Sequence, residues 1–151
     1  MNLNGFQPYR FEGLCQDFID ETYKHYLDDF YIESIHRSGQ SFKISLYTKN
    51  YRVVIDIDRI LSSMTTEESL FLTAGKYWAV SGQIKGSDFC FWAKESAYIE
   101  LLKSNRLNFA AATDGREAIH YFFAFSGLII DVVALDQPKI SLKLRAASPN
   151  D

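Results

Sequence analysis

Two apolar runs separated by Ser126-Gly127 form the most distinctive pattern along this chain. A serine-glycine pair between two such runs favours a tight turn, so the pattern predicts a β-hairpin of Ala118–Phe125 and Leu128–Leu135. Both runs contain very few polar residues, which is typical of strands buried inside a protein. We therefore expect this hairpin to be part of the core.

The first part of the chain has a different period. From Phe11 to Tyr26, apolar residues recur at every third or fourth position, which is the spacing of one face of an α-helix. Pro8 lies just ahead of this stretch, and its missing N–H group costs least at the start of a helix. The pattern predicts an amphipathic N-terminal helix over residues 11–26.

Downstream of this helix the period changes to two, which predicts strands. A two-residue turn at Ser38-Gly39 pairs Arg37 with Gln40. The same register sets Tyr31 opposite Leu46. We expect three antiparallel strands, at Phe30–Arg37, Ser41–Tyr47 and Tyr51–Asp58.

The middle of the chain mixes helix and strand signals. The spacing Thr65-x-x-Glu68 matches a capping box and predicts a short helical turn through Leu72. Two strands are expected around the turn Lys85-Gly86-Ser87, and a second helix follows; a continuous helix from Asp88 is the alternative. The expected strands are Lys76–Ile84 and Asp88–Ala93, and the expected helix is Lys94–Asn105.

Further strand signals lie on either side of the apolar hairpin. Asp114-Gly115 favours a hairpin turn, which predicts strands at Leu107–Ala112 and Glu117–Phe125. Alternation after the hairpin predicts an edge strand at Lys139–Arg145. Residues 146–151 are expected to fray.

Length and composition agree with one compact domain. The chain has 151 residues, of which 47% are hydrophobic and 23% charged, so it can bury a core. The expected fold is a single α+β domain over residues 1–151, with the N-terminal amphipathic helix packed on a mostly antiparallel sheet and the second helix inserted between strands. Cys15 and Cys90 lie among apolar residues and are interpreted as reduced core thiols. The chain shows neither a secretory signal nor an apolar run of about 18 residues, so a cytoplasmic location is expected.

One pair of polar residues interrupts the apolar hairpin. His120 lies opposite Val133, which places it diagonal to Asp131 on the same face, about 7–8 Å away. An aspartate that orients a histidine is half of a general-base arrangement, but no G-x-S-x-G, His-x-x-x-His or cysteine cluster completes it. We interpret Asp131 as a structural residue, hydrogen-bonded either to His120 or to backbone groups at the rim of the sheet, and we expect no catalytic residue, no metal site and no cofactor.

The pair Asp56 and Asp58 is a candidate for binding a metal ion. Their spacing places two carboxylates on one face of a strand, as in some magnesium sites. Arg52 shares that face and Lys43 flanks it on the neighbouring strand. Neutralisation by these cations is the simpler interpretation.

Charge is distributed unevenly along the chain. In total, 16 basic and 19 acidic residues give a net charge of −3, which argues against a protein whose main task is to hold a polyanion. Residues 1–33 carry a net −5, residues 34–63 a net +3 and the remainder −1. The acidic part predicts a docking surface for a basic partner, because opposite potentials speed encounter and fix the register. The residues expected to bind this partner are Glu12, Asp17, Asp20, Glu21, Asp28 and Asp29.

These properties lead to three hypotheses about function. In size, acidity and lack of catalytic motifs, the chain resembles the small acidic immunity proteins with which bacteria neutralise their own toxins. The resemblance implies a protein-binding module, an immunity or inhibitor protein whose partner is a basic toxin domain, and not an enzyme; neither nucleic acid nor membrane is expected as a partner. A small-molecule carrier is the alternative, with a pocket lined by the aromatic residues Trp78, Trp92, Tyr121 and Phe123. The least favoured alternative is a hydrolase-like enzyme that uses His120 and Asp131.

Overall fold

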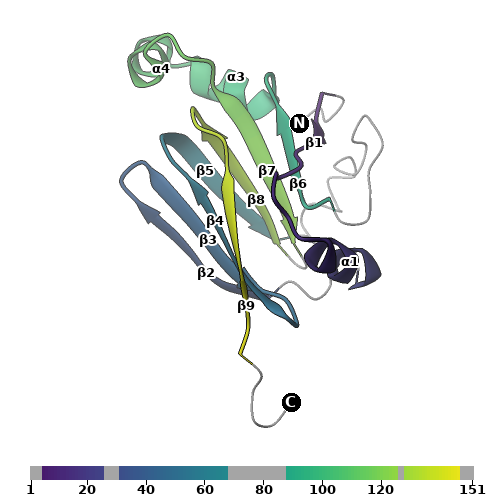
Figure 1. The fold of residues 1–151 in the computed structure, drawn as a ribbon. Coiled ribbons are helices and arrows are strands. Elements are labelled where there is room, and N and C mark those ends of the chain that lie inside the picture. The colour runs from purple at the N-terminus through teal and green to yellow at the C-terminus, as the bar shows by residue number, and fades with distance from the viewer. Residues whose placement is uncertain (1–4, 26–30, 68–87, 126–127, 147–151) are drawn as a thin grey trace.

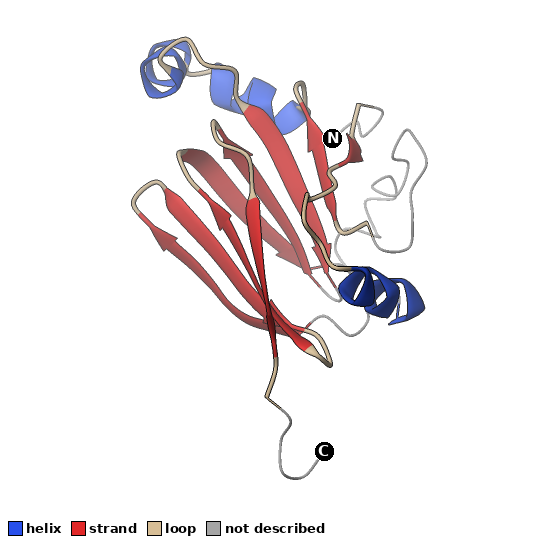
Figure 2. Cartoon of the chain, viewed as in Figure 1, coloured by secondary structure: helices blue, strands red, loops and turns tan. Residues whose placement is uncertain are grey.

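The chain folds into two antiparallel sheets accompanied by short helices (Figure 1). The computed structural model describes residues 5–25, 31–67, 88–125 and 128–146. The strands are β1 (Gln7–Pro8), β2 (Tyr31–Ser38), β3 (Ser41–Tyr47), β4 (Tyr51–Ile57), β5 (Ile60–Glu67), β6 (Cys90–Ala93), β7 (Ile119–Phe125), β8 (Leu128–Ala134) and β9 (Lys139–Leu144), and the helices are α1 (Gln16–His25), α3 (Ala97–Lys103) and α4 (Arg106–Thr113). Sheet A has the strand order β1-β6-β7-β8-β5, and sheet B has the order β2-β3-β4-β9. The predicted α+β class is confirmed, with strands predominating (Figure 2).

The main core lies between the two sheets, which face each other in Figure 1. Ile44 of sheet B belongs to the same buried apolar cluster as Phe123 and Val132 of sheet A. Phe18 of α1 joins this cluster, and its ring meets the ring of Tyr51 edge to face at 5.5 Å. The helix therefore adds its apolar side to the core between the sheets.

The two sheets differ in how many faces they bury. In β7 and β8, neighbouring residues that point to opposite faces are both buried, from His120 to Phe125 and from Ile129 to Ala134. In β4, fully buried residues alternate with more exposed ones. This difference explains why the apolar hairpin has no alternation, whereas the strands of sheet B have a period of two.

The apolar hairpin has the predicted register. β7 and β8 are antiparallel neighbours, with Phe125 opposite Leu128 and His120 opposite Val133. The turn residues 126–127 lie outside the described residues. The prediction of a buried hairpin is confirmed.

The N-terminal helix differs from the predicted one. α1 begins at Gln16 rather than near residue 11, follows β1 and has only 10 residues. Gly13 has a φ of +76°, a left-handed conformation that interrupts any helix continuing back toward residue 11. Pro8 lies in β1 at the edge of sheet A, where a strand tolerates proline, and not at a helix start. The prediction of a leading helix over residues 11–26 is therefore wrong.

The three predicted strands of sheet B are confirmed as β2, β3 and β4, but their first turn is shifted by one position. Ser38 pairs with Ser41, so the two turn residues are Gly39 and Gln40. Gly39 has a φ of +59°, and a glycine at the first turn position gives a hairpin turn the twist that matches its strands. The predicted pairing of Arg37 with Gln40 is wrong.

Two other stretches also differ from their predicted structure. Residues 65–67 continue β5 and pair with β8 instead of starting a helical turn. Leu107–Ala112 lies in α4 instead of a strand, because its consecutive alanines have the highest helix propensity. Asp114 and Gly115 end this helix with φ angles of +48° and +75° and do not turn a hairpin.

The remaining elements follow the sequence patterns. β6 lies within the strand predicted at Asp88–Ala93, which contradicts the alternative of a helix from Asp88. α3 lies within the helix predicted at Lys94–Asn105, and β9 is an edge strand beside β4. The strand predicted at Lys76–Ile84 lies outside the described residues.

The two cysteines have different surroundings. Cys90 is buried as predicted, whereas Cys15 is exposed, so the assignment of Cys15 to the core is wrong. Burial raises the pKa of the Cys90 thiol well above its ordinary value, and the nearby Asp88 carboxylate raises it further. The folded chain therefore keeps the Cys90 proton at a pH where an exposed thiol ionises.

We expect the free energy of unfolding to fall as the pH rises above about 8.5, the ordinary pKa of a thiol. The unfolded chain loses the Cys90 proton in this range while the folded chain retains it, so ionisation favours the unfolded state. Urea unfolding of the wild type and of Cys90→Ala at about pH 7.5 and about pH 9.5 measures the effect, because both proteins have the same tyrosines and the contribution of tyrosine ionisation cancels in the comparison. The wild type should lose about 1 kcal/mol more than the variant between these two conditions. Equal losses in the two proteins would contradict the expectation.

Candidate functional site

The buried histidine and aspartate predicted from the hairpin are joined by a third residue, Ser96. The Nε2 atom of His120 lies 2.6 Å from Oδ1 of Asp131, and its Nδ1 atom lies 2.8 Å from Oγ of Ser96. Ser96 is the N-cap of α3, and its Oγ accepts a hydrogen bond from the backbone N–H of Ile99. The structure therefore contains the connectivity Ser–His–Asp, with its members supplied by α3, β7 and β8.

One neutral tautomer of His120 satisfies nearly all of this network. In the tautomer with the proton on Nε2, His120 donates to Asp131, while the Ser96 hydroxyl donates to Nδ1 and accepts from Ile99. The exception is Oδ2 of Asp131, which is buried and has no hydrogen-bond partner among the described residues. A buried acceptor without a partner costs about 1–3 kcal/mol.

The network is enclosed and does not open onto a cleft. His120 and Asp131 have no exposed surface, and Ser96 is only 7% exposed. The rings of Phe6 and Tyr98 meet the imidazole edge to face, with centroid distances of 4.9 and 5.4 Å. Nucleophilic catalysis requires a hydroxyl that a substrate can reach. The geometry instead favours a structural role, in which the network attaches the start of α3 to sheet A.

The sequence pattern predicts two members of this network and misses the third. The hairpin register is sufficient to bring His120 and Asp131 together, but Ser96 lies 24 positions before His120 in the chain. A serine ahead of a predicted helix is typical of an N-cap. That signal predicts the cap and carries no information about which strand the cap contacts.

The structure describes three of the six residues expected to bind a partner. Glu12 precedes α1, Asp17 and Asp20 lie one turn apart on it, and all three are exposed. None of the three forms an ion pair with a lysine or arginine in the described parts of the chain, although Gln16 donates a hydrogen bond to Asp20 at 2.8 Å. We call these three residues the acidic surface. Of the other three, Glu21 is placed in α1 by its backbone, and Asp28 and Asp29 lie outside the described residues.

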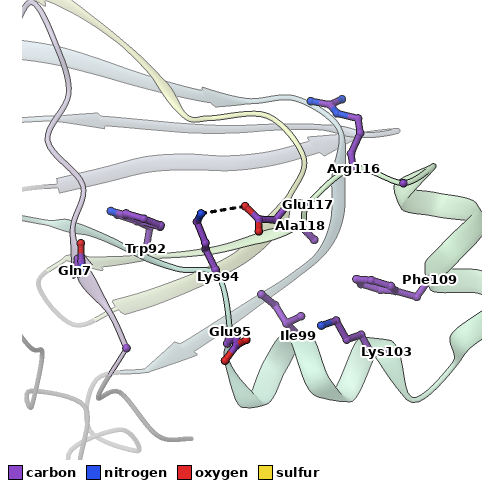
Figure 3. Close-up of a pocket in the computed structure, with 12 residues that line it drawn as sticks. Gln7, Trp92, Lys94, Glu95, Ile99, Lys103, Phe109, Arg116, Glu117 and Ala118 are labelled. Carbon is purple, nitrogen blue, oxygen red and sulfur yellow. Dashed lines mark ion pairs between the residues drawn. The ribbon is translucent and has the colours of Figure 1, made fainter.

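A pocket of about 690 Å³ lies between the end of β6, the helices α3 and α4, and the start of β7 (Figure 3). Trp92 lines one side of the pocket, and Phe109 of α4 lines another. Lys94 and Glu117 point toward each other across it and form an ion pair at 3.5 Å. Its volume suits a small ligand, because such sites commonly measure about 300–1,000 Å³.

The other cations that line this pocket also have acidic partners. Lys103 lies 3.6 Å from Glu100, and Arg116 lies 2.7 Å from Asp136. Ligand sites in general are mostly apolar with a few convergent polar groups, whereas this lining carries several paired charges.

The aromatic residues expected to line a carrier pocket do not line one pocket, although Trp92 is the cross-strand partner of Tyr121 and packs against the cluster that contains Tyr121 and Phe123. Trp92 lines the pocket described above, but Tyr121 and Phe123 are buried in the core between the sheets. Trp78 lies outside the described residues.

The two carboxylates spaced as in a magnesium site are held by residues of the chain itself. Asp56 lies 3.7 Å from Lys43, as the sequence predicts, and Asp58 accepts a hydrogen bond from Ser41 at 3.1 Å. Among the described residues, no group of three or more His, Cys, Asp or Glu side chains is placed to hold a metal ion.

Comparison with known protein families, curated proteins and solved structures finds no match for this chain. Function is therefore inferred from the fold and from the chemistry of its surfaces. No helix in the described ranges is long and apolar enough to cross a membrane.

Proposed function

We propose that this chain is a cytoplasmic protein-binding module, an immunity or inhibitor protein that neutralises a basic toxin domain through its acidic surface. The observation that carries the proposal is the exposure of Glu12, Asp17 and Asp20 without a basic partner among the described residues. Carboxylates that the chain does not neutralise itself remain available to attract a cationic partner, which speeds association and fixes orientation.

The acidic surface differs from acidic residues that the chain neutralises itself. Arg10 lies 3.3 Å from Asp88, and Arg116 lies 2.7 Å from Asp136. The Arg116 guanidinium lowers the pKa of Asp136, because its hydrogen bond favours the charged carboxylate. Such a carboxylate already has an ion pair within the chain, so a basic partner stabilises it less than it stabilises a carboxylate of the acidic surface.

Partly exposed apolar side chains accompany the acidic surface. Leu14 lies between Glu12 and Asp17 in the chain, and Phe11 stacks on Phe89 with centroids 5.6 Å apart. Stable interfaces combine an apolar centre with a charged rim. The neighbourhood of the acidic surface supplies both kinds of side chain.

The two alternative functions have weaker support. The His120–Asp131 pair is enclosed by protein, so an enzyme that uses it needs an opening to the surface. The pocket beside Trp92 has the volume for a small ligand, but its lysines and arginine are paired with acids of the chain. The enzyme therefore needs an opening to the surface, and the pocket offers a ligand few charges that are not already paired.

Reversing two charges of the acidic surface should weaken binding of a basic partner. The double variant Asp17→Lys/Asp20→Lys should lower its affinity roughly tenfold or more, since attraction becomes repulsion. The first partner to test is the product of the gene immediately upstream, co-expressed with this chain and recovered by affinity purification. Its retention should decrease as the salt concentration rises, because salt screens exposed charges.

The matched control is Glu95→Lys/Asp58→Lys, which changes the net charge equally at exposed positions outside the acidic surface. This control should retain the partner as well as the wild type does. Equal retention by all three proteins would show that the acidic surface does not bind the partner.

A further inference from the structure

Three rows of side chains cross the four strands of sheet B on the face that points away from sheet A. The strand register aligns one residue of each strand in every row. The first row is Tyr31, Tyr47, Arg52 and Lys143, the second is Ser34, Ser45, Val54 and Ser141, and the third is His36, Lys43, Asp56 and Lys139. None of the described helices covers this face in Figure 1, and most of these residues are exposed. We call this surface the outer face of sheet B.

A β-bulge in β2 places Tyr31 on this face. The register of β2 shifts between Ile32 and Ser34, and Tyr31 lies opposite Tyr47. The predicted partner is Leu46; the shifted turn at Gly39 and this bulge together account for the difference. Without the bulge, the alternation of the strand places Tyr31 and Ser34 on opposite faces. The rings of Tyr31 and Tyr47 therefore stack, with centroids 5.5 Å apart and planes 23° from parallel. Tyr31 remains 54% exposed.

Positive charge exceeds negative charge on the outer face of sheet B. Two cations are neutralised locally, since Arg52 lies 3.1 Å from Glu33 and Lys43 lies 3.7 Å from Asp56. Lys143 is exposed and has no acidic partner within the described residues. The excess charge therefore includes a lysine in the same row as the tyrosines.

Arg145 adds a second such cation beside the stacked rings. Its guanidinium lies 4.7 Å from the centroid of the Tyr47 ring, and Nη1 donates to the backbone carbonyl of Thr48 at 2.9 Å. These contacts fix the position of the side chain without a carboxylate, so its positive charge is not neutralised. Fixed cations next to an exposed aromatic ring are the two features with which proteins bind single-stranded nucleic acids.

We propose that the outer face of sheet B binds a single-stranded nucleic acid. A base stacks on the exposed ring of Tyr31 and extends the pair that Tyr31 makes with Tyr47. Arg145, beside the stacked rings, holds a phosphate near this base, and Lys143 on β9 holds a phosphate further along the nucleic acid, while the row of small residues leaves room for its chain. Four strands span about 14 Å, and four-stranded sheets in RNA-binding modules stack two or three bases on such a face.

The observations favour a nucleic acid strand over other polyanions. An acidic peptide uses the cations but not the exposed π-face of Tyr31, and a duplex keeps its base faces covered. The net charge of −3 argues against binding of a polyanion such as a nucleic acid. It is a sum over the whole chain, however, whereas binding depends on the charge of the contacting surface. This inference uses residues outside the acidic surface and does not depend on the proposed function.

Fluorescence anisotropy with a labelled single-stranded oligouridylate of about ten nucleotides, at about 50 mM salt, tests the proposal on the full chain. The wild type should bind, with an affinity that falls steeply as salt increases. Tyr31→Ala should weaken binding about 5- to 150-fold, because base–aromatic stacking is lost. Lys143→Gln should reduce the slope of log affinity against log salt by about one, because one phosphate contact is lost.

Three controls test whether binding depends on this face of the sheet and on the bases of the strand. Lys103→Gln removes a positive charge on α3 and should leave affinity and slope unchanged. An abasic strand of the same length should bind more weakly than oligouridylate and should not respond to Tyr31→Ala. Thermal unfolding should show that both binding variants are fully folded at the temperature of the binding assay, since the two residues are exposed.

Several outcomes would overturn the proposal. Failure of the wild type to bind oligouridylate at low salt would do so directly. Equal effects of Lys103→Gln and Lys143→Gln would place the contact elsewhere on the molecule. Equal binding of the abasic strand, with no effect of Tyr31→Ala, would identify a surface for polyanions in general, acidic proteins included.

Discussion

Replacement of His120 by leucine is expected to lower the free energy of unfolding by about 3–5 kcal/mol. Leucine fills roughly the volume of the imidazole, so the loss comes mainly from Asp131 and not from a cavity. The carboxylate loses its 2.6 Å partner at Oδ1, and Oδ2 has none among the described residues. A carboxylate with no exposed surface and no donor is a strongly unfavourable group inside a protein.

Urea unfolding at neutral pH measures this loss, and a double variant separates its causes. His120→Leu/Asp131→Leu removes the isolated carboxylate together with its partner, so it should recover most of the stability. Ser96→Ala should cost about 2–4 kcal/mol, because it removes the N-cap of Ile99, worth about 1 kcal/mol, and leaves the buried Nδ1 of His120 without its partner, which costs about 1–3 kcal/mol. If His120→Leu unfolds at the same urea concentration as the wild type, the pair is not structural and its reactivity must be reconsidered.

The sequence predicts correctly those elements in which the spacing of apolar residues matches the pattern of buried positions. Sheet B buries one face, so its strands alternate, and the hairpin of β7 and β8 buries both faces, so it has two unbroken apolar runs. That hairpin also fixes the relative positions of His120 and Asp131, because both residues lie close to the same turn. Contacts set by a short turn can therefore be predicted from sequence alone.

The incorrect predictions come from signals that fit two structures. Asp114-Gly115 provides left-handed residues for a hairpin turn and equally for the end of a helix, and the structure uses them for the helix end. The apolar spacing that begins at Phe11 suits a helix, but Gly13 interrupts it with a positive φ. Local patterns of this kind do not determine which structure forms; tertiary packing does.

The two proposed binding surfaces also differ in whether the sequence alone can predict them. The acidic surface is visible in the sequence because its residues are close together in the chain. The row that contains Tyr31 and Lys143 is not visible in the sequence, because its residues come from four strands. Its alignment also depends on the one-position shift of the turn between β2 and β3 and on the bulge in β2. Since a shift of one residue moves a side chain to the other face, this surface could only be found from the structure.

Truncation of Phe123 is the second change with a large expected effect. Phe123→Ala should lower the free energy of unfolding by about 3–5 kcal/mol, the usual cost of deleting a buried ring. Phe123 has no exposed surface, lies in β7 between Cys90 of β6 and Ile130 of β8, and stacks near Phe125 at 6.1 Å. The space is bounded by two hydrogen-bonded sheets, which cannot close over it without losing strand pairing, so a cavity remains.

Leu107→Ala is the matched control, because Leu107 is a large apolar residue that is 84% exposed on α4. Its effect should stay within about 0.5 kcal/mol. Urea unfolding of both variants compares the core between the sheets with a surface position of similar chemistry. If the two truncations cost the same, sheets A and B do not pack on each other over Phe123. The outer face of sheet B would then lose the rigid support on which its rows of side chains depend.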